Sequence, residues 1–174
     1  MSGYLAYYSH IYLRKKLIKL FLGNKGIDLP FVREVYIFIY MYTPTTKLIK
    51  ITEKYYKSLR TIYSPSLAES IKFNRHGWNH LLYDGTGHRR SEAQIRLRLF
   101  LFKDVKEAII KHVGYPEVTT KKIYISKIDL DVTYYEINSR LKTGKYLKVI
   151  IRKFPDGEYH YYSLRRGKKT KNPL

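Results

Sequence analysis

Apolar and polar positions alternate with a helical period in the first third of the chain. Between residues 4 and 22 every fourth position from Leu13 to Phe21 is apolar and Lys and Arg are frequent elsewhere, which predicts a basic amphipathic helix. Residues 44–62 repeat the helical pattern, whereas residues 31–42 fit either a strand or a buried helical turn. The expected apolar stripe of the second helix comprises Leu48, Ile51, Tyr55, Leu59 and Ile62.

Ser64-Pro65-Ser66 breaks this pattern and is the expected domain boundary. Residues 67–83 contain a short helical stretch, and a loop follows at 84–87. Ser91, with Gln94 three residues later, forms a capping box that opens a long helix ending before Gly114 and Pro116. Its expected buried stripe is Ile95, Leu99, Phe102, Val105 and Ile109.

The period then changes from helical to two, which indicates strands. Four strands are expected, at 122–128, 132–141, 146–154 and 157–165. Turn signals separate them, and the acidic pair Asp129 and Asp131 is expected in the turn between the first two. Short strands joined by tight turns predict an antiparallel β-meander.

Together these elements predict an α+β fold in which helices pack on one face of a four-stranded antiparallel β-meander. A mainly helical N-terminal segment precedes it. The expected domains are a basic appendage at 1–65, a second domain at 66–167 and a basic flexible tail at 168–174.

The charge balance of the chain indicates what kind of partner it binds. The chain has 34 Lys and Arg residues against 14 Asp and Glu, a formal net charge of +20, which attracts polyanions. Nucleic acid is the most common such partner, and an anionic membrane surface is the second. The 19 Tyr residues add rings for base stacking, although many of them are expected in the core.

Other classes are excluded by what the sequence lacks. There is no Cys, which excludes disulfides, thiolate zinc sites and Cys nucleophiles. No run approaches the ~20 apolar residues that span a bilayer, and no secretory signal pattern opens the chain. We therefore expect a soluble protein that acts in the cytoplasm.

His76 and His80 are the first candidates for chemistry, because residues four apart share one face of a helix. Such a pair can chelate zinc, but the third ligand and the carboxylate of a zinc site are not evident. One His could instead pack or cap the helix. The remaining interpretation is acid/base work, since the pKa of His lies near neutrality.

RNA suits a site made of such residues, because its 2′-hydroxyl is a built-in nucleophile. The enzyme needs only to remove that proton, protonate the leaving 5′-oxygen and stabilise the phosphorane. Carboxylate clusters that would hold Mg²⁺ are not evident in the sequence. We therefore expect neither a metal nor a cofactor.

Two regions could bind the phosphate. The Gly85–Arg90 loop carries His88, Arg89 and Arg90 and leads into a capped helix, whose N-terminus favours anions, although it could also be an ordinary solvated loop. The last two strands form a basic, hydroxyl-rich sheet surface. In the last strand His160 and Tyr162 are expected on the face opposite Ser163 and Arg165. The preceding strand contributes Lys148 and Arg152.

Residues 66–174 resemble the barnase/EndoU/colicin/RelE-like nuclease superfamily, especially its phage- and mobile-element-associated branch. The matching features are His-x-x-x-His-Leu at His76 to Leu81, the basic pair in Arg89-Arg90-Ser91 before a long helix, and Tyr161-Tyr162-Ser163 in the last strand of a meander. Residues 1–65 lie outside the resemblance.

The resemblance implies a metal-independent ribonuclease, often a toxin that cleaves tRNA or ribosome-bound mRNA. It implies that His80 and His76 are acid/base residues, that Arg89 and Arg90 bind phosphate, and that Ser163 supplies a hydroxyl, with His160 as a further catalytic candidate. An acidic antitoxin or immunity protein is the partner that this class implies. The product would carry a 2′,3′-cyclic phosphate.

Two other functions fit the same sequence. A non-catalytic RNA- or DNA-binding module would explain the charge and the Tyr residues, and its binding would depend steeply on salt without turnover. A membrane-surface protein could use the basic helix at 4–22. The RNA target and the oligomeric state are open.

Overall fold

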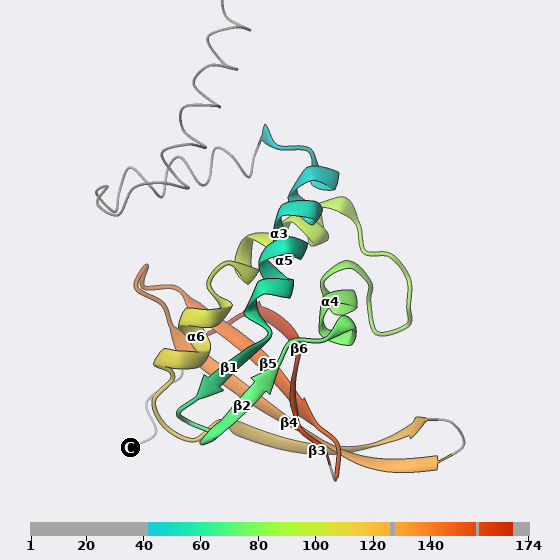
Figure 1. Ribbon diagram of the computed structural model, residues 1–174, viewed down its shortest axis with the longest axis vertical. Coiled ribbons are helices and arrows are strands. Elements are labelled where there is room, and N and C mark those ends of the chain that lie inside the picture. Colours follow the sequence, from blue (N-terminus) through green and yellow to red (C-terminus); the bar gives the residue numbers. More distant parts are fainter. Residues whose placement is uncertain (1–41, 126–127, 156, 169–174) are drawn as a thin grey trace, which may run out of the picture. The chain divides into compact units, whose positions relative to one another are not determined.

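The computed structural model describes residues 42–125, 128–155 and 157–168. The chain divides into two compact units, Met1–Thr43 and Pro44–Leu174, and only the second is described below (Figure 1). The expected helix at 4–22 lies outside the described residues, as do the segment 31–42 up to residue 41 and the tail beyond Lys168. The expected boundary at Ser64 to Ser66 lies within the second unit, because α3 (Thr45–Leu59) and β1 (Thr61–Ser64) belong to it.

The second unit is an α+β fold, which confirms the expected class. Helices α3, α5 and α6 lie on one side of a twisted sheet in Figure 1. The other helices are α4 (Arg75–Leu82), α5 (Glu92–Phe102) and α6 (Val105–Lys111). The other strands are β2 (Glu69–Lys72), β3 (Glu117–Ile125), β4 (Ile128–Arg140), β5 (Tyr146–Lys153) and β6 (Tyr159–Arg166).

The sheet has six strands in the order β1-β2-β6-β5-β4-β3. The predicted four-stranded antiparallel meander therefore has two strands fewer than the sheet of the structure. The four predicted strands form its antiparallel half, β3 to β6. β1 and β2 form an additional hairpin, and β2 pairs with β6 in parallel, with Ile71 opposite Tyr159. The sheet is therefore mixed.

Local corrections follow from tertiary packing. The short helical stretch expected within 67–83 is α4, and the strand β2, which was not expected, precedes it. The long helix after Ser91 is two helices separated at Lys103 and Asp104. Asp129 and Asp131 lie within β4, paired with β3, and not in a turn.

The buried stripe of α3 is also shifted from the expected one. Leu48 is buried as predicted, but Ile51 is 54% exposed, and Thr52 and Tyr56 are buried instead. Tyr56 packs into an aromatic cluster with Phe102 and Tyr161. The face of α3 that carries the Tyr56 ring, and not the one that carries Ile51, is therefore turned toward the core. The predicted stripe of α5 and α6 is buried throughout.

The core lies between the helices and one face of the sheet. Leu147, Val149 and Ile151 of β5 are fully buried, whereas the alternate residues Lys148 and Arg152 are partly exposed. This alternation follows from the pleat of a strand, which sends successive side chains to opposite faces. The face away from the core is therefore available to a ligand. Among the described residues, no helix is long and apolar enough to cross a membrane.

Candidate functional site

Helix α4 is positioned by Asn74, the residue before its first turn. The Asn74 side-chain oxygen accepts a hydrogen bond from the Gly77 backbone N–H at 3.2 Å, which satisfies one of the free amides at the helix start. The Tyr56 hydroxyl donates to the Asn74 carbonyl at 2.7 Å. Asn74 therefore joins the start of α4 to the aromatic core.

Gly77 allows α4 to pack directly against β6. A β-carbon at this position would collide with the carbonyl oxygen of Tyr161, and would lie 2.6 Å from Cδ1 of the Tyr161 ring and 2.5 Å from the Tyr56 hydroxyl. Only a residue without a side chain fits such a backbone contact. This close approach brings His80, in the next turn of α4, to the strand.

The His80 ring packs on Tyr162 of β6, with centroids 4.0 Å apart. Burial, and after it the positive charges of Arg152, Arg90 and Arg98, lower the pKa of His80 from 6.5 to about 4. His80 is therefore uncharged at neutral pH. An uncharged imidazole can accept a proton, which is the state that a general base requires.

Three arginines, Arg90, Arg98 and Arg152, lie near enough to His80 to lower its pKa. Among the described residues, no carboxylate lies within ion-pair distance of Arg90, Arg98 or Arg152. The Nε atoms of Arg90 and Arg152 are buried and make no hydrogen bond in this part of the chain. A partly buried cation without a partner is costly, so these groups form a site that an anion would stabilise.

The guanidinium of Arg152 packs on two aromatic rings. Its guanidinium lies 4.7 Å from the centroid of the Phe154 ring and 4.9 Å from that of Tyr162. Stacking fixes the plane of a guanidinium while its N–H groups stay free to donate. The Arg152 guanidinium is therefore held by aromatic rings, and no carboxylate in the described ranges pairs with it.

Arg98 and Ser163 form a second supporting contact. Nη1 of Arg98 donates to Ser163 Oγ at 3.1 Å and to the Leu164 carbonyl at 3.0 Å, which ties α5 to β6. Ser163 is buried, and its hydroxyl oxygen accepts from Arg98. The structure thus places Ser163, expected as a catalytic hydroxyl, where it positions an arginine.

A β-bulge corrects the expected alternation of β6. Register shifts between Ile150 and Ile151 leave Tyr162 as an extra residue, so Ser163 lies opposite Ile150, and His160 lies opposite Arg152. Burial alternates from His160 to Ser163 as the sequence predicts and then stops, because Ser163 and Leu164 are both buried. Tyr161 and Leu164 are both fully buried.

His160 is oriented by the same Asn74 that caps α4. Asn74 Nδ2 lies 3.0 Å from His160 Nδ1. Because the Asn74 oxygen is used by the helix cap, Nδ2 donates, and the neutral His160 ring carries its proton on Nε2. Burial lowers the pKa of His160; Glu158 opposes this, and Arg152, Lys72 and His76 add to it.

His76 is exposed and lies one turn before His80 on α4. Its charge lowers the pKa of both His80 and His160, which places it near both rings. No group of three or more His, Asp or Glu side chains in the described ranges is arranged to hold a metal ion. His76, His80 and His160 instead lie near Arg152 and one another.

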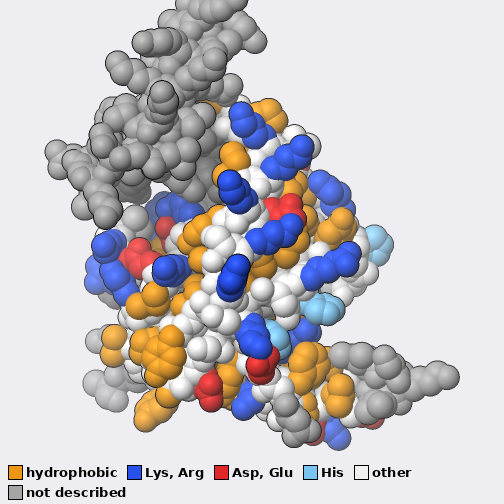
Figure 2. Space-filling view, viewed as in Figure 1, with side chains coloured by type: hydrophobic (Ala, Val, Ile, Leu, Met, Phe, Trp, Pro, Cys, Tyr) orange, Lys and Arg blue, Asp and Glu red, His pale blue; other side chains and the backbone are white. Residues whose placement is uncertain are grey.

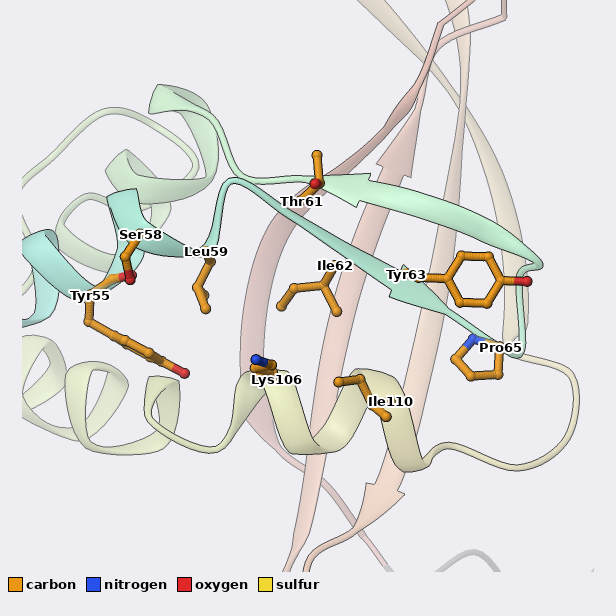
Figure 3. Close-up of a pocket in the computed structure, with 9 residues that line it drawn as sticks. All are labelled: Tyr55, Ser58, Leu59, Thr61, Ile62, Tyr63, Pro65, Lys106 and Ile110. Atoms are coloured by element: carbon orange, nitrogen blue, oxygen red, sulfur yellow. The ribbon is translucent and has the colours of Figure 1, made fainter. Parts of the chain in front are cut away.

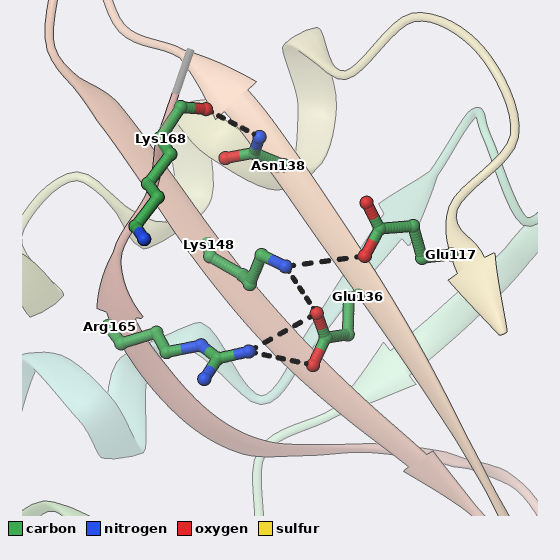
Figure 4. A network of polar contacts seen from close by, with 6 residues as sticks. All are labelled: Glu117, Glu136, Asn138, Lys148, Arg165 and Lys168. Atoms are coloured by element: carbon green, nitrogen blue, oxygen red, sulfur yellow. Dashed lines mark hydrogen bonds and ion pairs between the residues drawn. The ribbon is translucent and has the colours of Figure 1, made fainter. Parts of the chain in front are cut away.

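Lys148 and Arg165 were both expected to bind phosphate, but both form ion pairs with glutamates. Figure 4 shows Glu136 between them, with Glu117 as a second partner of Lys148. Lys148 Nζ lies 3.3 Å from Glu117 and also contacts Glu136, and Arg165 Nη2 lies 3.0 Å from Glu136. Bonds from Lys148 and Arg165 hold the pKa of Glu136 below its usual value, although burial opposes them. This network is internally neutralised.

Hydrogen bonds within the loop before α5 join Asp84 to Thr86 and His88. The Asp84 carboxylate accepts from the backbone N–H groups of Thr86 and His88 and from the Thr86 hydroxyl. His88 Nδ1 lies 2.8 Å from that hydroxyl, and both His88 and Arg89 are exposed. No described contact joins either residue to His80, so of this basic loop only Arg90 reaches the site.

A separate hollow of about 610 Å³ lies between α3, β1 and α6 (Figure 3). Ile62 and Ile110 face each other across it, and Tyr63 and Pro65 lie at its end. Among the residues that line it, Lys106 carries a charge, and none is a histidine. The hollow is therefore distinct from the arginine site around His80.

Two important residues were missed from the sequence. Asn74 was detectable, since Asn is a favoured residue just before a helix. Arg98 was not, because its position within α5 matches that of an ordinary solvated helix residue. Its function depends on the packing of α5 against β6, which are distant in sequence.

Comparisons with known proteins give no match. No protein-family model matches the chain, and no curated protein and no solved structure matches it.

Proposed function

We propose that this protein is a metal-independent RNA endonuclease of the toxin type that leaves a 2′,3′-cyclic phosphate. One observation carries the proposal: three arginines without carboxylate partners in the described part of the chain lie near His80, whose ring packs on Tyr162 and whose pKa is lowered. Cations bind the phosphate of RNA, and a neutral imidazole can accept the 2′-hydroxyl proton. The high positive charge of the chain supports a polyanionic substrate.

The scissile phosphate binds between Arg90, Arg98 and Arg152. These groups also stabilise the phosphorane, in which negative charge builds up on the non-bridging oxygens. Arg152 is held by its two aromatic neighbours and Arg98 by β6, so little reorganisation is needed when the ligand binds.

His80 is the general base. Its imidazole takes the proton from the 2′-hydroxyl while the 2′-oxygen forms a bond to phosphorus. Burial, and after it three guanidinium charges, lower the pKa of the free ring to about 4, which makes it a weak base; a bound phosphate offsets the guanidinium charges. The pKa of His80 therefore rises when the phosphate of the substrate binds.

The bond from phosphorus to the 5′-oxygen then breaks, and the leaving oxygen takes a proton from His76. His76 lies near both other histidines, on the same helix as the base. The Nε2–H of His160 donates a hydrogen bond to a phosphate oxygen. Both proton transfers thus involve side chains of α4.

The resemblance to toxin nucleases suggests the setting. We place the action of the protein in the cytoplasm, on tRNA or mRNA, with an acidic antitoxin or immunity protein as its inhibitor. Such a partner would cover the site and neutralise the basic surface.

The test is incubation with total tRNA and a mixed RNA in excess EDTA, beside His80→Ala. Discrete fragments from the wild type alone support the proposal. RNA that stays intact with both proteins while binding is tight would instead establish a nucleic-acid-binding module without turnover.

A further inference from the structure

The outer face of α3 carries a row of lysines that the proposed active site does not use. Lys47, Lys50, Lys54 and Lys57 recur at intervals of three and four and are all exposed. They lie opposite the buried stripe of the same helix. At 1.5 Å per residue the row is about 15 Å long.

Most of this row has no acidic partner among the residues that the structure describes. Glu53 pairs with Lys57 at 2.6 Å, but within the described part of the chain Lys47, Lys50 and Lys54 form no ion pair. Like charges on neighbouring turns repel one another, so the row costs stability until an anion covers it. An uncompensated row of cations is typical of a surface that binds a polyanion.

The row is fixed relative to the helix that carries Arg98. Arg96 of α5 donates to the Thr45 hydroxyl at the start of α3, and that hydroxyl contacts Glu92. In Figure 2 blue side chains run along α3, and histidines are visible beyond them on the same face of the molecule. One extended ligand could therefore contact both.

We propose that the lysine row of α3 binds the phosphate backbone of the same RNA, away from the cleaved bond. This inference rests on the proposed function for its ligand, and it assigns a substrate class: polynucleotides that extend beyond the nucleotides at the site. Short fragments would fill the arginine site but leave α3 empty.

An anionic membrane is the less favoured ligand for this surface. A helix that lies in a membrane interface buries its apolar face in lipid. The apolar face of α3 is instead occupied by the core, with Leu48 and Tyr56 buried. The exposed face offers charge and one partly exposed Ile51, which suits a hydrated phosphate chain.

The test uses a long 2′-O-methyl RNA, which lacks the nucleophile and so cannot be cleaved by the proposed mechanism. The variant is Lys47→Gln with Lys50→Gln and Lys54→Gln, and Gln preserves helix propensity. The control is Lys121→Gln with Lys122→Gln and Lys145→Gln, three exposed lysines elsewhere that remove the same charge. Circular dichroism confirms that both variants fold.

We expect the α3 variant to reduce the slope of log K against log salt by about two, since each phosphate contact contributes ~0.7 on single strands. The control should change it by less than half as much. In cleavage assays, kcat/KM should fall for long RNA but stay unchanged for a trinucleotide.

Equal slopes for the two variants would overturn the inference even if wild-type protein cleaves RNA. Loss of binding to anionic vesicles by the α3 variant, with an unchanged RNA slope, would also overturn it and assign the row to a membrane. Conversely, a protein that cleaves nothing but shows the α3-specific slope would refute the proposed nuclease and keep the binding surface.

Discussion

Gly77 of α4 lies against the Tyr161 carbonyl of β6 with no space for a β-carbon between them. This contact sets the distance between the helix that carries His76 and His80 and the strand that carries His160 and Tyr162. The proposed active site is therefore built on one backbone contact between elements far apart in the sequence.

Gly77→Ala should destabilise the fold. Overpacking costs ~1–3 kcal/mol, whereas the better helix propensity of Ala returns at most ~1 kcal/mol. Urea denaturation should show a lower midpoint. Gly85→Ala is the control, because nothing lies within 4 Å of its β-carbon position. Equal midpoints for the two variants would show that α4 does not depend on this contact.

The pKa of His80 should respond to phosphate. NMR titration of the free protein should give a value of about 4, because burial and three arginines disfavour the charged ring. Inorganic phosphate bound between those arginines should raise it, since the anion offsets their charge. His88, which lies in the loop outside the site, is the internal control. If the pKa of His80 does not change with phosphate, the arginines do not bind an anion close enough to His80 to affect its protonation.

The same pKa makes stability depend on pH. The unfolded chain has an ordinary His80 pKa near 6.5, so between pH 6.5 and about 4 the unfolded state binds more protons than the folded state. The stabilisation is present above pH 6.5 and is lost as the pH falls. His80→Gln should therefore flatten the fall in the free energy of unfolding across this window. Parallel curves for the variant and the wild type would contradict the lowered pKa.

Asn74→Asp should change the protonation of His160 without removing the helix cap. Asp is as good an N-cap as Asn, but its carboxylate accepts where the amide donated, so the pKa of His160 should rise. NMR titration measures this shift. Asn74→Ala tests the cap, and should cost ~1 kcal/mol of stability by urea denaturation. An unchanged pKa of His160 in the Asp variant would mean that the contact does not set its tautomer.

Arg152→Gln should weaken phosphate binding, whereas Arg165→Gln should not. Arg152 has a buried Nε without a partner among the described residues, while Arg165 is already paired with Glu136. A charge-assisted hydrogen bond contributes roughly 1.5–3 kcal/mol, so loss of Arg152 should weaken binding at least tenfold by calorimetry. A similar loss in both variants would indicate a diffuse electrostatic effect.

Local signals in the sequence predicted the elements that depend on local interactions. Ser91 caps α5 by accepting from the Gln94 amide, as the capping box indicated. The four strands from β3 to β6 are joined in sequence order, so their alternating pattern and turns predicted them. His76, His80, Arg90 and Arg152 were chosen by residue type, and the fold places them close to one another.

Features that depend on distant packing were not predictable in this way. The parallel pairing of Ile71 with Tyr159 joins segments with no local signal for each other. The β-bulge at Tyr162 ends the strict alternation of β6, so that Ser163 and Leu164 are both buried. Lys148 and Arg165 matched the expected chemistry, but their cross-strand acids could be identified only from the strand register.

The most direct test of the nuclease proposal is the chemical analysis of the ends made from one long RNA in excess EDTA. Wild-type protein should give fragments ending in a 2′,3′-cyclic phosphate by mass spectrometry, and the 2′-O-methyl form of that RNA should remain intact. His80→Ala should bind both RNAs and cleave neither. Cleavage of the 2′-O-methyl RNA, or full activity of His80→Ala, would contradict the assignment of the 2′-hydroxyl as nucleophile and His80 as its base.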